Sequence, residues 1–564
     1  MFIPTTMEEA GALGWDRFDV ILVTGDTYID SPYLGTAVIG RVLMDAGYRV
    51  GIIAQPDTGS AADITRLGEP RLFWGVSSGS VDSLVSNYTA TGKRRLQDDL
   101  TPGGKNTRRP DRAVIVFTNH IRQHFKDTVP IVIGGIEASL RRVAHYDFRD
   151  DKIRRSILFD AKADILAYGM AERTVTELAA CLASGKDFHG VRGLCYIAGY
   201  TISDYIKLPS FESVSQDKNE FMKMSRVFFG NSDPLSARGM VQKHGDRYLV
   251  HNPPAVPLSS EELDHVYELP YERDVHPYYK KTGSVRALDT IRFSITTHRG
   301  CFGGCNFCSI AVHQGSEIVS RSEESIIREA RSFAKHPAFR GIIADIGGPT
   351  ANMYGMLCKN MARKGICADR RCLGDHVCRV MSISHKSQIS LLRKIRNVPG
   401  VRRAFVASGI RHDLVMADTV GGEEYLSEIV KYHVSGQLKI APEHCVDRVL
   451  DLMGKPSAEV LLSFRDLFVR LNRQHRKKQF LTYYLIAAHP GSTLNHMKAL
   501  RSFVQRELHL DPEQVQIFTP LPSTWSTVMY YTGRDPFAGR DIFVERNTAE
   551  KEKQKRALGR PRKD

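Results

Sequence analysis

Short apolar runs of strand length alternate with helix-length segments along almost the whole chain, and this alternation constrains the fold more than any other feature. Between residues 19 and 54, DVILVTGD, AVIGRVLMDAG and YRVGIIA are typical of a strand, a helix and a second strand. Further strands are predicted at Leu72–Val76, Ala113–Thr118, Val129–Gly134 and Asp164–Tyr168. Such alternation favours a parallel sheet with helices on both faces, and therefore an α/β fold.

A second series of strand and helix segments follows the first and suggests two domains. The chain has 564 residues, well beyond the roughly 250 to 300 at which single cores tend to split. We expect a Rossmann-like domain at 17–190, a polar, Pro-rich connector with some helix at 191–285, and about six βα units at 286–535. Six units predict a partial (β/α)6 barrel rather than a closed barrel of eight. Residues 536–564 form a basic tail.

Three cysteines lie in the segment RGCFGGCNFC at the start of the second series. Cys301, Cys305 and Cys308 are spaced C-x3-C-x2-C, without an adjacent fourth cysteine. Three thiolates can hold three irons of a [4Fe-4S] cluster, and the fourth iron then keeps an open coordination position. The alternatives are a zinc ion completed by His298 or by a distant ligand, and chance clustering of the cysteines. Because seven of the ten cysteines fall between Cys301 and Cys378, metal binding is favoured over disulfide formation.

The pattern C-x3-C-x-aromatic-C, with Phe307 before the last cysteine, resembles the signature of radical S-adenosylmethionine (radical SAM) enzymes. The resemblance implies that the open iron is chelated by the amino and carboxylate groups of S-adenosylmethionine. It also implies that a reducing electron donor supplies an electron that splits the sulfonium, giving methionine and a 5'-deoxyadenosyl radical. The substrate that this radical would act on is not identified by the sequence.

The same resemblance implies further cofactor contacts at the ends of later strands. A Gly-Gly-Glu-like turn meets the methionine amino group in the superfamily; here the acidic residue is replaced, so backbone carbonyls or Thr350 would have to serve. Ser408 belongs to a motif that contacts the ribose and carboxylate, and Arg411 suits a bidentate carboxylate contact. LKIAPEH resembles a segment of radical methylthiotransferases. The cofactor-binding candidates are Phe307, Gly347, Gly348, Thr350, Ser408, Arg411 and Glu443.

Longer segments narrow the resemblance to the YgiQ family of radical SAM proteins, over roughly residues 17 to 545. The segments are TGDTYIDSPYLGTAVIGRVLMDAGYRVGIIAQP, GGIEASLRR, YGMAERTV, DIGGPTANMYGMLC, SGIRHD and VMYYTG. The reaction of that family is not established, so the resemblance implies a cofactor more than a substrate. It implies a Rossmann-like, cobalamin-binding-like parallel sheet domain followed by a partial (β/α)6 radical SAM barrel.

The N-terminal domain lacks the histidine with which many such domains bind cobalamin. YGMAERTV matches the position of their Gly-Glu-Gly-Glu-like turn, but the segment DSPYLG at 30–35 has no histidine where the pattern Asp-x-His-x-x-Gly requires one. From the sequence we therefore do not expect cobalamin to be a cofactor.

A second cysteine group lies in a Cys-rich insertion at 351–380. Cys358, Cys367, Cys372 and Cys378 are spaced C-x8-C-x4-C-x5-C, and His376 is a spare candidate ligand. Four thiols match a complete ligand set, either for zinc or for a second iron-sulfur cluster. Because the insertion follows the end of a strand, we expect it to cover the mouth of the active site.

Charge and hydropathy suggest a cytoplasmic protein and permit a polyanionic partner. The formal net charge is +15 and the pI about 9.3, which allows RNA as a substrate or partner. No apolar run approaches the roughly 20 residues that span a bilayer, and the N-terminal segment is not a secretory signal. The alternative to an enzyme is an iron-sulfur or zinc protein that binds nucleic acid through basic loops. The ordered strand-end motifs favour the enzyme.

Overall fold

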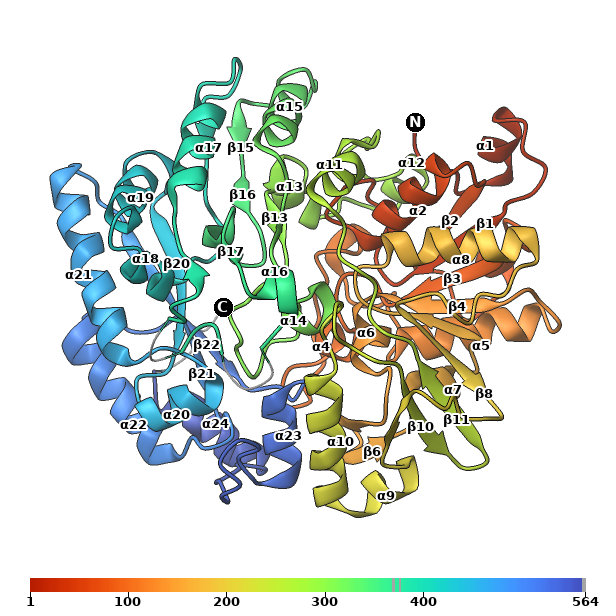
Figure 1. Ribbon diagram of the computed structural model, residues 1–564. Helices are drawn as coiled ribbons and strands as arrows, with labels where there is room; N and C mark the ends of the chain where they lie inside the picture. Colours follow the sequence, from red (N-terminus) through yellow and green to blue (C-terminus); the bar gives the residue numbers. More distant parts are fainter. Residues whose placement is uncertain (368–370, 375–376, 560–564) are drawn as a thin grey trace. The chain divides into compact units, whose positions relative to one another are not determined.

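The computed structural model describes residues 1–367, 371–374 and 377–559, and the chain divides into two compact units, Met1–Arg292 and Phe293–Asp564 (Figure 1). Unit 1 is built on a nine-stranded sheet with the order β2-β1-β3-β4-β7-β8-β11-β10-β9. Its strands are β1 Val20–Thr24, β2 Val50–Ala54, β3 Phe73–Ser77, β4 Ile131–Gly134, β7 Ile165–Ala167, β8 Leu194–Ala198, β9 Ile206–Leu208, β10 Met240–His244 and β11 Arg247–His251. A separate hairpin joins β5 His145–Asp147 to β6 Lys152–Arg154.

The first five strands of the sheet are parallel, as their continuous apolar runs predict. Their order, 2-1-3-4-7, places a topological switch point between β1 and β3, where ligands bind in doubly wound sheets. The register aligns Thr24 with Ser77 and Ser77 with Gly134, so these strands end at one common edge. The sheet continues through β8, β11 and β10, which are joined by antiparallel pairs.

Helices cover the sheet of unit 1 in the expected α/β manner. Buried side chains of α2 and α8, such as Leu43 and Leu178, share one apolar cluster with Val20 and Ile52 of the sheet. The helices are α1 Met7–Ala12, α2 Gly35–Asp45, α3 Ala62–Thr65, α4 Ser83–Asn87, α5 Ala113–His124, α6 Gly135–Leu140, α7 Ile157–Ala161, α8 Glu172–Ser184, α9 Phe211–Gln216, α10 Lys218–Gly230, α11 Ser260–Glu268, α12 Pro277–Lys280 and α13 Ala287–Ile291.

Two expectations for unit 1 differ from the structure. The strand predicted at Ala113–Thr118 is the first half of helix α5, whose buried Val114, Phe117 and Ile121 follow helical spacing. A short apolar run does not by itself distinguish a buried strand from a buried helix. The connector predicted at 191–285 instead contains β8 to β11, four strands of the same sheet, because its polar and Pro-rich loops hide short strand segments.

Unit 2 contains short parallel strand pairs that follow one another along the chain. β12 pairs with β16, β15 with β19, β20 with β21, and β21 with β22, all parallel, and a parallel bridge joins Ile410 to Ile440. The strands are β12 Ser294–Thr296, β13 His298–Arg299, β14 Val319–Ser320, β15 Ile342–Ile343, β16 Asp345–Gly347, β17 Leu357–Cys358, β18 Met381–Ser382, β19 Arg403–Ala404, β20 Gln437–Glu443, β21 Phe480–Ala487 and β22 Gln514–Ile517.

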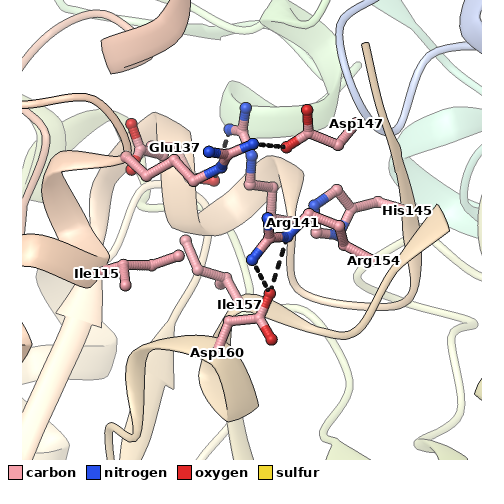
Figure 2. Close-up of a pocket in the computed structure, with 9 residues that line it drawn as sticks. Ile115, Glu137, Arg141, His145, Asp147, Arg154, Ile157 and Asp160 are labelled. Atoms are coloured by element: carbon pink, nitrogen blue, oxygen red, sulfur yellow. Dashed lines mark hydrogen bonds and ion pairs between the residues drawn. The ribbon is translucent and has the colours of Figure 1, made fainter. Parts of the chain in front are cut away.

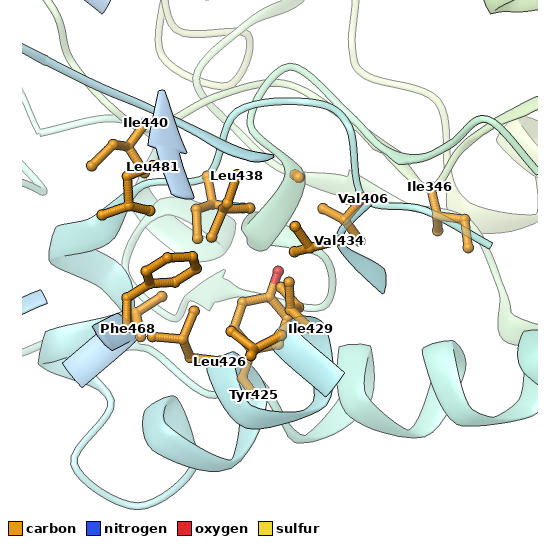
Figure 3. Close-up of a cluster of buried hydrophobic side chains, with 14 of the residues drawn as sticks. Ile346, Val406, Tyr425, Leu426, Ile429, Val434, Leu438, Ile440, Phe468 and Leu481 are labelled. Carbon is orange, nitrogen blue, oxygen red and sulfur yellow. The ribbon is translucent and has the colours of Figure 1, made fainter. Parts of the chain in front are cut away.

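The helices of unit 2 bury one apolar face each against these strands. In α21, Leu461, Phe464, Phe468 and Leu471 repeat at helical spacing and are buried. Figure 3 shows Phe468 in the same cluster as Leu438 of β20. The helices are α14 Ile310–Gln314, α15 Glu323–Ala334, α16 Met361–Lys364, α17 Lys386–Arg396, α18 His412–Ala417, α19 Gly422–Glu428, α20 Asp447–Met453, α21 Ala458–Gln474, α22 Leu494–Phe503, α23 Trp525–Thr532 and α24 Thr548–Arg556.

The segment predicted as a basic tail contains a docked helix. Asn547 caps α24, Gln554 Oε1 accepts a hydrogen bond from the backbone N–H of Ala488 at 3.2 Å, and Leu558 is fully buried in the core of unit 2. The composition predicted a solvated tail because the segment is rich in charged residues. The buried apolar side chain that anchors its end, Leu558, is one leucine among many charges. Within the described ranges, no helix combines the length and apolar composition that crossing a membrane requires.

Candidate functional site

The three-cysteine loop is closed at its base by a short antiparallel pair. His298 and Arg299 of β13 pair with Ser320 and Val319 of β14, which fixes both ends of the intervening loop. Gly300 has φ +84°, and a Cβ there would lie 1.8 Å from the carbonyl oxygen of Glu317. Only glycine therefore allows this turn into the first cysteine.

Asn306 fixes the middle of the loop against helix α20. Its backbone N–H donates to the carbonyl of Met453 at 2.9 Å, and its side-chain amide donates to the carbonyl of Leu452 at 2.8 Å. Asn306 is buried and lies between Cys305 and Cys308 in the chain. Its two hydrogen bonds therefore hold this part of the loop in a defined conformation. No sequence pattern predicted a role for Asn306.

The three thiols lie close enough together to affect one another's ionisation. Burial raises the pKa of Cys308 to about 12, with further contributions from Cys305 and Cys301, and burial also raises the pKa of Cys301. Cys308 Sγ accepts a hydrogen bond from the backbone N–H of Ile310 at 3.5 Å. Since metals bind the thiolate, iron would have to displace protons that the buried thiols hold firmly.

Arg411 lies against the cysteine loop, and its guanidinium is already engaged by protein groups. Nη1 is 3.4 Å from Cys305 Sγ and 3.3 Å from the carbonyl oxygen of Gly303. Nε and Nη2 donate to the carboxylate of Asp413 at 2.9 and 2.6 Å. Burial would raise the pKa of Asp413, but Arg411 outweighs it and lowers the pKa to about 2. The Arg411 guanidinium, which we predicted to bind the carboxylate of SAM, thus binds the Asp413 carboxylate in this structure and directs one N–H at Cys305 Sγ.

The Gly-Gly turn lies directly against β13 of the cysteine loop. A Cβ on Gly348 would lie 2.6 Å from Cε1 of His298, so this approach requires glycine. His298 is fully buried, its Nδ1 is 2.9 Å from Thr297 Oγ1, and burial lowers its pKa to about 4. The Thr350 hydroxyl lies 3.9 Å from Cys301 Sγ, which places this predicted cofactor residue beside the first cysteine.

Ser408 is fixed by Asp345, a residue that sequence reasoning did not assign to the site. The Asp345 carboxylate accepts hydrogen bonds from the Ser408 hydroxyl, from the backbone N–H of Ser408 at 2.9 Å and from that of Ala407 at 2.7 Å. A Cβ on Gly347 would lie 3.0 Å from Ser408 Oγ. The ends of two adjacent strands are therefore held together. The acidic residue at the start of the Gly-Gly segment DIGG was the available signal.

Glu443 and Lys455 form a buried pair beside the aromatic residue of the cysteine motif. Glu443 has φ +68° and lies 3.8 Å, Oε1 to Nζ, from Lys455. Burial raises the pKa of Glu443, and the Lys455 charge opposes that rise. Lys455 Nζ is 5.9 Å from the ring centre of Phe307, which also contacts His489 edge to face at 6.3 Å. Lys455 was not predicted, because it does not belong to the cysteine pattern.

The second cysteine group lies in unit 2, on the insertion that β17 and β18 close. Cys358, Cys367, Cys372 and Cys378 are all half-buried, while the spare candidate His376 lies outside the described residues. Among the residues that the structure describes, no set of three or more His, Cys, Asp or Glu side chains is gathered as a single metal ion requires. Cys358, Cys372 and Cys378 do pack against the same apolar cluster as Cys301.

Unit 1 contains a small polar cavity (Figure 2). Its charges are paired: Arg112 Nη2 lies 3.1 Å from Asp147, and Arg154 Nη2 lies 2.8 Å from Asp160. We therefore assign this cavity a structural role. It is lined by Arg112, Ile115, Glu137, Arg141, His145, Asp147, Arg154, Ile157 and Asp160.

The carboxyl edge of the sheet in unit 1 is a separate region. Asp26 follows β1 and is bound by Arg109 at 2.7 Å and by the backbone N–H of Ser80 at 2.6 Å. The next residue, Thr27, is buried, and its hydroxyl has no hydrogen-bond partner within the described part of the chain. An unused buried polar atom at a switch point is a feature that a bound ligand can satisfy.

Solved structures with this fold correct one prediction. The radical SAM methyltransferase TsrM from Kitasatospora setae, with cobalamin and a [4Fe-4S] cluster bound, matches with a TM-score of 0.51 at 17% identity, over 91% of this chain and 77% of that one. The same enzyme with tryptophan and a SAM analogue matches with a TM-score of 0.50 at 16% identity, over 90% and 74%. Our expectation that cobalamin is not a cofactor is therefore wrong. TsrM has a similar fold and binds cobalamin although only 17% of the aligned residues are identical.

Family comparisons cover nearly the whole chain. The family described as Radical SAM N-terminal matches residues 2–294, and the radical SAM superfamily matches residues 295–504. A UPF0313 protein of Fusobacterium nucleatum is 52% identical over 100% of this chain and 99% of its own length, and one of Thermotoga neapolitana is 48% identical over 98% of each. The chain belongs to the UPF0313 family of radical SAM enzymes, as its resemblance to YgiQ proteins implied.

Proposed function

We propose that this protein uses a [4Fe-4S] cluster on Cys301, Cys305 and Cys308 to cleave S-adenosylmethionine reductively. The observation that carries the proposal is the loop itself: three neighbouring thiols on a rigid turn, with a buried guanidinium 3.4 Å from the middle sulfur. Three thiolates leave one iron open for a chelating ligand. The bound cluster would supply the electron that converts S-adenosylmethionine to methionine and a 5'-deoxyadenosyl radical.

The residues around the loop have complementary roles in this proposal. Thr350, which follows the Gly347-Gly348 turn, lies 3.9 Å from the Cys301 sulfur, so this turn is where we place the methionine end of the cofactor. Phe307, Glu443 and Ser408 remain predicted cofactor contacts on the strand ends around it. The parallel pairs in chain order support a partial (β/α)6 barrel as the frame of the site.

Product analysis tests the proposal directly. The full-length protein is reconstituted anaerobically with iron and sulfide, reduced with dithionite and given S-adenosylmethionine; we expect 5'-deoxyadenosine by mass spectrometry. Cys305→Ala should lose both the cluster absorption and the product. Cys445→Ala, at a half-buried cysteine outside both groups, should keep both. An intact cluster that yields no 5'-deoxyadenosine would contradict the proposal.

Cobalamin is a candidate second cofactor, for unit 1. The likeness to TsrM in fold supports it, and the unpartnered buried hydroxyl of Thr27 at the switch point fits a ligand rich in amides. The loop at 30–35 supplies no histidine, so any cobalt ligand would have to come from elsewhere. Reconstitution with hydroxocobalamin, followed by gel filtration, should leave the corrinoid absorption bands on the full-length protein. Protein that elutes without corrinoid would exclude cobalamin.

A methyl transfer is the reaction class that such a pair of cofactors would support, and it remains a proposal. The net charge of +15 permits RNA or another polyanion as the substrate. The non-enzymatic nucleic-acid-binding alternative is set aside, since residues 2–504 match radical SAM families.

A further inference from the structure

We infer that Cys358, Cys367, Cys372 and Cys378 hold a second metal centre in unit 2, with four protein thiolates as its ligands. Four cysteines form a complete ligand set for zinc or for an iron-sulfur cluster, whereas the loop at Cys301 provides three. The two centres would therefore differ in kind: one open for a cofactor and one closed by the protein.

An antiparallel strand pair closes the base of the insertion. β17 and β18 pair antiparallel, with Leu357 opposite Ser382 and Cys358 opposite Met381. The backbone N–H of Cys378 donates to the carbonyl of Cys372 at 2.9 Å, and that of Met381 donates to the carbonyl of Cys378 at 3.0 Å. These bonds bring Cys358, Cys372 and Cys378 to the closed end of the insertion.

The fourth cysteine, Cys367, lies between these segments in the chain. It follows helix α16 and the turn at Gly365, whose φ is +81°. Cys367 comes nine residues after Cys358 and five before Cys372, and it would complete a set of four thiolates.

The part of the insertion from Cys358 to Cys378 has few apolar side chains with which to stabilise itself. Met361 and Leu373 are buried there, but Lys359, Arg363 and Lys364 are exposed. Short segments with such small cores usually need a disulfide or a metal to fold. None of these four cysteines forms a disulfide in the structure, which leaves them available as metal ligands.

The insertion is also attached to the loop of the first centre. Arg371 Nη2 donates to the side-chain oxygen of Asn306 at 3.2 Å, and Cys358, Cys372 and Cys378 pack against the apolar cluster that contacts Cys301. A metal that rigidifies the insertion would therefore also rigidify the cysteine loop.

Metal analysis of a full-length variant that lacks the first site tests the inference. In Cys301→Ala/Cys305→Ala/Cys308→Ala protein purified anaerobically, we expect residual metal in stoichiometric amount. About four iron and four sulfide per chain would identify a cluster, and about one zinc a zinc site; either result supports the inference. Neither metal in folded protein would overturn it. Because the first site is already removed, the result is independent of the proposed cleavage reaction.

A fourth substitution assigns the residual metal to its ligands. Adding Cys372→Ser should remove it, while adding Cys445→Ser, the matched control, should not. Retention of the metal in the Cys372→Ser protein would overturn the assignment.

A measurement on the unmodified protein guards against loss of folding in the variants. In native wild-type protein, iodoacetamide should leave the four cysteines unmodified, and it should label them after acid unfolding has released the metal. Labelling of all four in the native protein would contradict the inference.

Discussion

At the scale of single residues, Arg411 makes protein contacts that its motif does not specify. Its guanidinium donates to the Asp413 carboxylate through Nε and Nη2 and lies 3.4 Å from Cys305 Sγ through Nη1. Hydrogen bonds to cluster sulfurs raise the reduction potential of an iron-sulfur cluster. Arg411→Gln should therefore lower the potential of the reconstituted cluster in an EPR redox titration. Asp413→Asn keeps the N–H that faces the sulfur and should change the potential less.

The same pair predicts a measurable effect on stability. Arg411→Gln leaves the buried Asp413 carboxylate without its partner and should lower the free energy of unfolding by about 3–5 kcal/mol. The double variant Arg411→Gln/Asp413→Asn should recover much of that loss in denaturant titrations. If Arg411→Gln is as stable as the wild type, the Arg411–Asp413 ion pair does not stabilise the folded protein.

At the scale of elements, helix α24 shows that the C-terminal segment is part of the core of unit 2. Leu558 is fully buried, so Leu558→Ala should lower the free energy of unfolding by about 2–5 kcal/mol. Lys553→Ala, on the exposed side of the helix, should change it by less than about 0.5 kcal/mol. Equal stability of the two variants in thermal and denaturant unfolding would show instead that α24 does not dock.

At the scale of the whole molecule, buried histidines make unit 1 sensitive to acid. His244 is stacked between Phe159 at 4.5 Å and Phe211 at 5.5 Å, and neither ring nitrogen has a hydrogen-bond partner within the described residues. Burial lowers its pKa from 6.5 to about 4. The unfolded chain therefore binds a proton below pH 6.5 that the folded chain excludes, and stability falls as the pH drops from 6.5 towards 4.

The size of this effect can be measured. One histidine shifted this far contributes on the order of 3 kcal/mol at most across that interval. His244→Phe removes the titrating group while it keeps the aromatic stack, so its unfolding midpoint should fall less steeply with pH than that of the wild type. Identical pH profiles for the two proteins would show that His244 does not cause the acid sensitivity.

Prediction from sequence succeeded where the local pattern contained the information. The β1–α2–β2 unit and strands such as Phe480–Ala487 follow from apolar periodicity, and the three-cysteine loop follows from spacing. It failed at Ala113–Thr118, where a buried run is ambiguous, and at 191–285, where strands such as β9 span only three residues. The role of Lys455 could not be predicted, because it reaches Glu443 and Phe307 only when distant segments fold together.

The sequence by itself determined the α/β class, the two-part organisation and the cysteine chemistry, since periodicity and ligand spacing are local properties of the chain. Only the tertiary structure decided which groups surround those cysteines. Arg411 is held by Asp413 beside Cys305, His298 lies against Gly348, and the pairing of β17 with β18 closes the insertion that carries the second cysteine group. Such neighbours come from long-range packing, in which charge pairing and burial select partners that no short pattern specifies.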